Sequence, residues 1–67
     1  MEWISVKDKD LPSADKYITG FSFPAIHIYY GFGLVQKQIT GDWAFTNNHK
    51  YLSDVTNVTH WIDLPSQ

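Results

Sequence analysis

Residues 26–46 of this 67-residue chain have the sequence IHIYYGFGLVQKQITGDWAFT, in which glycines separate three short runs rich in apolar side chains. The glycines fall in Gly31-Phe32-Gly33 and in Gly41-Asp42, and glycine accepts the positive φ angles of tight hairpin turns. The runs have the length of β-strands and are too short for stable helices. We therefore predict three consecutive antiparallel strands, a meander, over residues 26–30, 34–40 and 43–46.

Side chains at alternate positions of a strand share a face, so the same runs predict the two sides of the sheet. In the first run Ile26, Ile28 and Tyr30 fall on one side, and His27 and Tyr29 fall on the other. In the third run both aromatic rings fall on one side. The pattern thus assigns Ile26 and His27 to opposite faces.

The segment before the meander adds a strand and a short helical turn. Residues 17–23 alternate as a strand that is expected to end at Pro24, because proline donates no hydrogen bond to a sheet ladder. Ser13 stands where it would cap one helical turn at residues 14–16.

The two ends of the chain each contain a Trp-Ile pair within a short β-type run, at residues 3–6 and 58–62. We predict that these two terminal strands pair with each other, which would bury Trp3 and Trp61 side by side. Residues 49–57 fit a single helical turn but no full helix.

The whole chain, residues 1–67, is therefore predicted to be one mainly β domain. Its architecture is a small antiparallel sheet of about five short strands, a flat or rolled meander, with at most one or two short helical turns. A chain this short buries only about 60% of the surface that its unfolded form exposes, so its stability is marginal. The absence of cysteine excludes disulfides and thiolate zinc sites. That leaves packing of the aromatic residues, 16% of the chain, or a partner subunit to stabilise the domain.

The charge balance limits the classes of partner. Five lysines, no arginine and seven acids give a formal net charge of −2, which argues against nucleic acid and against anionic membrane surfaces. No apolar run approaches the roughly 20 residues of a membrane span. The first residues also lack the basic and apolar regions of a signal peptide, so we expect a cytoplasmic protein.

Three histidines, His27, His49 and His60, are the candidates for metal ligation or proton transfer. No two of them have the three-to-five-residue spacing of helical or finger-type metal sites. His60 alternates with Val58 and Ile62, which places it on their face. A structural role is favoured for it over a functional one, and the functional role stays open. There is no nucleophile elbow, and so small a sheet is expected to hold no pocket of the usual size, about 300 Å³ or more. The sequence thus predicts no catalytic residue, no cofactor, no metal and no enzymatic activity.

Both ends of the chain carry motifs with a family resemblance. Trp-Ile-Ser-Val-Lys-Asp (residues 3–8) with a following Leu-Pro, and Val-Thr-His-Trp-Ile-Asp-Leu-Pro (residues 58–65), resemble the phage and prophage family catalogued as domain of unknown function 551. The middle of the chain agrees only in its strand-and-turn character and in Trp43. The opening motif has an extra residue before Leu11, and Asp63 stands where proline is common. The resemblance implies a phage or prophage accessory protein located in the host cytoplasm, and it implies no activity, because the family has no agreed one.

The aromatic side chains exceed what one face of a small sheet buries, and three interpretations of the surplus remain open. The surplus rings are Tyr29, Tyr30, Phe32, Trp43 and Tyr51. The first is a protein-contact surface, for which Tyr29, Tyr30, Trp43 and His60 are the candidate binding residues. The second is stacking on single-stranded nucleic acid or sugar, which the missing arginine disfavours. The third is a two-sided core or a homodimer interface.

We predict from these observations a non-enzymatic accessory protein that binds a host or phage protein, for example to inhibit a host defence or replication enzyme. The alternative is a structural or regulatory subunit of a phage complex that acts through self-association. A single-stranded nucleic-acid-binding module ranks third.

Overall fold

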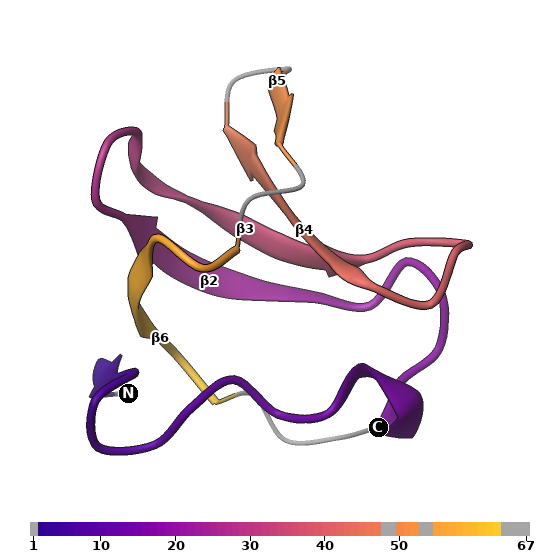
Figure 1. Cartoon of the computed structure of the whole chain (residues 1–67), viewed down its shortest axis with the longest axis horizontal. Coiled ribbons are helices and arrows are strands. Elements are labelled where there is room, and N and C mark those ends of the chain that lie inside the picture. The colour runs from indigo at the N-terminus through magenta and orange to yellow at the C-terminus, as the bar shows by residue number, and fades with distance from the viewer. Residues whose placement is uncertain (1, 48–49, 53–54, 64–67) are drawn as a thin grey trace.

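The computed structural model describes residues 2–47, 50–52 and 55–63, which form a six-stranded antiparallel sheet and one 3-10 turn. The strands lie in the order β1-β6-β2-β3-β4-β5 (Figure 1). The elements are β1 (Ile4–Ser5), η1 (Ala14–Lys16), β2 (Ser22–His27), β3 (Gly31–Lys37), β4 (Trp43–Asn47), β5 (Lys50–Leu52) and β6 (Val58–Trp61). The prediction of a mainly β antiparallel fold is confirmed.

The predicted meander forms as β2-β3-β4, but its first two strands and the turn between them begin at least three residues earlier than predicted. Residues 28–30 make the turn, and His27 pairs with Gly31 across it. Gly31 has a φ of 73°, so this glycine does serve the turn. Gly33 instead lies inside β3, where a Cβ atom would collide with the ring of Phe45 on β4. The second glycine is therefore required by close packing and not by a turn.

Pro24 does not end a strand, as the sequence suggested, but lies in the middle of β2. The Phe21 carbonyl accepts the Lys37 N–H on the β3 side at 2.9 Å, whereas the Pro24 carbonyl accepts the Ile62 N–H on the β6 side at 3.1 Å. The N–H that proline lacks would therefore point toward β6. Pro24 lies opposite Ile62, one residue beyond the end of β6, so the missing N–H removes a bond only at the end of this ladder.

The two ends of the chain pair as predicted, because β6 lies between β1 and β2 and places Trp61 opposite Ile4. Trp61 is 1% exposed, and its Nε1 donates a hydrogen bond to the Lys9 carbonyl at 3.0 Å. Trp3 is 41% exposed, and its ring meets that of Phe32 edge-on at 6.3 Å between centroids. The predicted burial is thus right for Trp61 and wrong for Trp3. Ile4 lies opposite Trp61 and shares its face, and Trp3 faces the other side because successive residues of an extended segment alternate.

The core lies between one face of the sheet and the connection from β1 to β2, which runs below the sheet in Figure 1. Its buried members are Phe23, Ala25, Val35, Trp43, Phe45, Val58 and Trp61. The connection adds partly buried side chains, among them Leu11 and Tyr17. Two indole N–H groups hold this connection against the sheet. Trp43 Nε1 donates to the Pro12 carbonyl at 2.8 Å, and Trp61 Nε1 donates to the Lys9 carbonyl. The predicted helical turn η1 forms within it, although the side chain of Ser13 makes no capping hydrogen bond.

Candidate functional site

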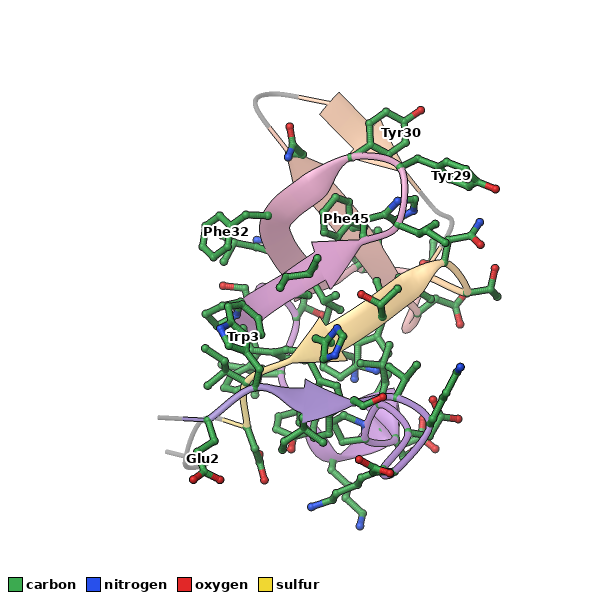
Figure 2. All side chains as sticks on the ribbon, turned by 90° about the vertical axis from the view of Figure 1, so that its left-hand side faces the viewer. Glu2, Trp3, Tyr29, Tyr30, Phe32 and Phe45 are labelled. Carbon is green, nitrogen blue, oxygen red and sulfur yellow. The ribbon has the colours of Figure 1, made fainter. Side chains whose placement is uncertain are left out.

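Exposed apolar side chains gather on the hairpin formed by β2 and β3 (Figure 2). Of the eight large hydrophobic side chains that are exposed among the described residues, five lie between residues 28 and 34. Trp3 joins them through its ring contact with Phe32. We call these six residues the hairpin surface: Trp3 (41% exposed), Ile28 (61%), Tyr29 (74%), Tyr30 (45%), Phe32 (64%) and Leu34 (40%).

The hairpin surface covers both sides of the hairpin. On the side away from the core, Phe32 packs against Trp3. On the core side, the rings of Tyr30 and Tyr29 lie 5.1 and 5.9 Å from the buried ring of His27, measured between centroids. Figure 2 accordingly shows Phe32 and Tyr29 projecting to opposite sides of the hairpin. A molecule that contacts all of these rings must therefore enclose the hairpin end.

This part of the chain carries no charge. There is no Asp, Glu, Lys or Arg from Tyr17 through Gln36, a segment that includes all of β2 and the turn at residues 28–30. The turn is held from β4 by Asn47, whose Nδ2 donates to the Tyr30 carbonyl at 3.0 Å and also to the carbonyl of Phe32. The arrangement suits an apolar partner surface and offers no cation to a phosphate.

The structure exposes Tyr29 and Tyr30, as the prediction of binding residues requires, but it buries Trp43. The Trp43 side chain is 9% exposed, and its ring meets Phe23 edge-on at 5.1 Å between centroids. Its Nε1 donates a hydrogen bond to the Pro12 carbonyl. The expectation that Trp43 lies on the surface is therefore wrong, because alternation along β4 places it in the core.

His60, the fourth predicted binding residue, is half-buried on β6 and lies on a different face from the one predicted. Ile26 lies opposite His60 whereas His27 lies opposite Val58, so Thr59 is the extra residue of a β-bulge. The bulge breaks the alternation, so that Val58 faces the core and His60 faces away from it. His60 Nδ1 lies 3.0 Å from Oγ1 of the neighbouring Thr59, within hydrogen-bond distance.

Sequence reasoning missed Leu34 and Trp3 as members of the surface, and it counted Phe32 among the surplus rings without naming it as a binding residue. Gly31-Phe32-Gly33 was assigned to the turn, which hid the alternation that places Phe32 and Leu34 on one face of β3. The strand-like continuation from residue 32 to residue 36 was the available signal. His49 lies outside the described residues.

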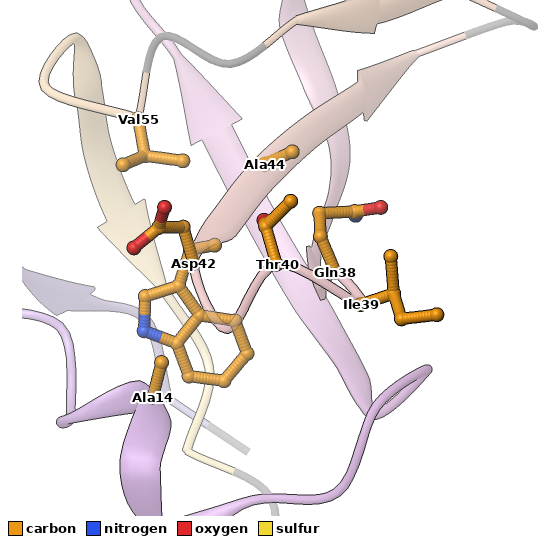
Figure 3. A pocket seen from close by; sticks show the side chains of 8 residues that line it. Ala14, Gln38, Ile39, Thr40, Asp42, Ala44 and Val55 are labelled. Atoms are coloured by element: carbon orange, nitrogen blue, oxygen red, sulfur yellow. The ribbon is translucent and has the colours of Figure 1, made fainter.

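A pocket of about 560 Å³ lies at the other end of β3, around the turn that leads to β4 (Figure 3). Side chains from residues 38–44 line it together with Ala14 and Val55. The expectation that the chain holds no pocket of about 300 Å³ or more is therefore wrong. Asp42 is the one ionisable side chain among the described residues that line it.

Within the described ranges, no three His, Asp or Glu side chains come close enough together to hold a metal ion. Among the same residues there is no helix with the length and apolar character needed to span a membrane. No protein-family model, curated protein or solved structure matches the chain.

The contrast between Trp43 and Tyr29 gives a first testable prediction. Trp43→Phe keeps an aromatic ring but removes the N–H that reaches Pro12, and it is expected to lower the free energy of unfolding by about 1–2 kcal/mol. Tyr29→Ser removes a ring that is 74% exposed, and it is expected to change the free energy by no more than about 0.5 kcal/mol. Urea denaturation followed by tryptophan fluorescence measures both. Equal destabilisation by the two changes would contradict the assignment of Trp43 to the core and Tyr29 to the surface.

Proposed function

We propose that this chain is a protein-binding domain and that the hairpin surface is its contact site. The observation that carries the proposal is the exposure of uncharged aromatic rings on both sides of one hairpin, with Tyr29 74% and Phe32 64% exposed. Contiguous apolar surface of this kind marks interaction sites in soluble proteins. Aromatic anchors contribute most when a partner encloses them in a pocket.

The proposed partner is a different protein with an uncharged, concave apolar site. A two-fold dimer would pair the hairpin surface with itself, and two projecting hairpin ends do not enclose each other. Insertion of the hairpin into a pocket on the next copy would be a head-to-tail contact, which propagates into rings or filaments. A concave site on another protein accommodates both sides of the hairpin without either difficulty.

The resemblance of the end motifs supports a phage or prophage origin, with the partner a host or phage protein. Binding of this type acts by occupying a surface, and inhibition of a host defence or replication enzyme is the corresponding activity. The first four residues of the closing motif form β6, and Val58 and Trp61 among them belong to the core. These residues support the fold, and the hairpin supplies the contact.

The proposal predicts a sharp difference between two sets of exposed residues. Phe32→Ser and Tyr29→Ser are each expected to weaken partner binding by roughly thirtyfold, because truncating an enclosed aromatic anchor commonly costs about 2 kcal/mol. Ile39→Ser is the matched control, since Ile39 is 90% exposed but lies in the turn at the other end of β3. It is expected to leave affinity within about twofold.

The measurement has two steps: affinity capture from a bacterial lysate, and titration calorimetry with the captured protein after its purification. Saturable one-to-one binding that falls with the hairpin variants and not with Ile39→Ser supports the proposal. Equal loss with Ile39→Ser, no effect of the hairpin variants, capture of nucleic acid or of nothing, or self-association that Phe32→Ser abolishes in sedimentation experiments would each overturn it.

A further inference from the structure

We infer that His27 is a positioning residue for the hairpin surface, whose neutral imidazole holds the turn at residues 28–30 so that Tyr29 and Tyr30 are presented to a partner. The presentation of the two tyrosines to a partner rests on the proposed binding function. The hydrogen bond between His27 and the Tyr29 amide can be measured on the free chain. An experiment can therefore contradict the role of His27 without contradicting the binding function, and the reverse.

His27 is the buried polar side chain of an otherwise apolar core within the described residues, and it is 2% exposed. It is the last residue of β2 and immediately precedes the turn. Placing an imidazole at such a position costs desolvation energy that an apolar side chain would not, unless the ring makes specific hydrogen bonds. A role in shaping the turn accounts for its presence.

The imidazole makes that bond to the turn itself. His27 Nδ1 accepts the backbone N–H of Tyr29 at 3.1 Å, two residues along the chain. A nitrogen that accepts a hydrogen bond carries no proton, so the proton of the neutral ring belongs on Nε2. The geometry corresponds to an Asx turn, in which a side-chain acceptor binds the N–H two residues later.

The ring also joins the turn to the rigid centre of the sheet. Its centroid lies 4.9 Å from that of Phe45, a fully buried residue of β4, and 5.1 Å from that of Tyr30. Gly31, opposite His27 in the register, closes the turn with its positive φ of 73°. The position of the Tyr29 backbone and of the Tyr30 ring therefore both depend on where the imidazole lies.

Two amide substitutions separate the contribution of Nδ1 from that of the rest of the ring. The Oδ1 atom of asparagine lies close to the place of Nδ1, whereas the longer glutamine side chain carries its amide to the neighbourhood of Nε2. His27→Asn therefore retains an acceptor for the Tyr29 N–H, and His27→Gln does not. His27→Phe, which keeps a ring but has no acceptor, is the third variant.

Hydrogen exchange of the Tyr29 amide is the readout, because it reports this bond without a partner. Relative to wild type, exchange is expected to accelerate roughly fivefold in His27→Gln and His27→Phe and to stay within about twofold in His27→Asn. The Gly41 amide, bonded to the Gln38 carbonyl at 2.9 Å in the far turn, is the internal control for a turn that the substitutions do not touch. With the purified partner, affinity should follow the same order.

In the wild type, the ring nitrogens provide a test that does not depend on any variant. We expect Nδ1 of His27 to resonate as an unprotonated nitrogen with a coupling across the hydrogen bond to the Tyr29 amide. A protonated Nδ1, or equal acceleration of Tyr29 exchange in His27→Asn and His27→Gln while Gly41 stays protected, would overturn the inference. Normal Tyr29 protection in His27→Asn combined with absence of any partner would instead contradict only the binding function.

Discussion

Trp61→Ala is expected to cost about 3–5 kcal/mol of unfolding free energy, which is most of the stability available to a domain of this size. Trp61 is 1% exposed, its ring packs on Phe23 at 5.6 Å between centroids, and it lies opposite both Ile4 and Ala25. The change leaves a cavity in the core and removes the indole N–H that holds the Lys9 carbonyl. It therefore affects β6, β2 and the connection that covers the core at once.

Trp3→Ala is the matched control for that change, because Trp3 immediately precedes β1, the strand that pairs with β6, but is 41% exposed. Its cost is expected to be no more than about 1 kcal/mol. Thermal unfolding followed by circular dichroism compares the two variants. Cooperative melting of Trp61→Ala at the wild-type temperature would show that β6 does not close the sheet.

Gly33→Ala is expected to lower the free energy of unfolding by about 3 kcal/mol, although it adds a single methyl group. A Cβ built at Gly33 lies 2.5 Å from Cζ of Phe45 and also meets the carbonyl oxygen of Thr46. Neither neighbour moves easily, because Phe45 is 0% exposed and the carbonyl belongs to the backbone of β4, which pairs with β3. The added methyl group therefore forces β3 and β4 apart.

Gly41→Ala provides the comparison, since Gly41 has a φ of 97° but nothing within 4 Å of its built Cβ. Its expected cost is backbone strain alone, about 1 kcal/mol. Denaturant titrations give both values. If Gly33→Ala proved no more destabilising than Gly41→Ala, the close approach of β3 to β4 would be incorrect.

Much of the fold could be predicted from the sequence because strands have a local signature. The meander, the glycine turns and the pairing of the two ends all follow from alternation, from Gly31 and Gly41, and from the similar Trp-Ile pairs. The errors arose at glycine and proline, because each of these residue types occurs in two structural settings. Gly33 resembles a turn glycine but lies in a strand because of Phe45, and Pro24 resembles a strand end but sits where its neighbour has already ended. Both settings depend on residues that are distant in sequence, namely Phe45 for Gly33 and the end of β6 for Pro24.

The candidate site was predicted only in part for the same reason. Tyr29 and Tyr30 follow from the excess of aromatic residues around the meander, whereas the burial of Trp43 depends on which face the connection from β1 to β2 covers. The face of His60 depends on a bulge at Thr59, which alternation cannot indicate. The role inferred for His27 requires the distance to the Tyr29 amide, and sequence spacing alone supplies no such distance.

The position of Pro24 has a consequence for synthesis on the ribosome. β6 is translated after all the other strands, so until it emerges the nascent meander presents the side of β2 that β6 later covers as a bare strand edge. Bare edges of this kind pair with other chains and start aggregation. Pro24 lies in the middle of β2, next to the residues that β6 later covers, and lacks the N–H that would point outward from this edge. We expect this proline to weaken pairing between nascent chains while leaving the ladder to β3 intact.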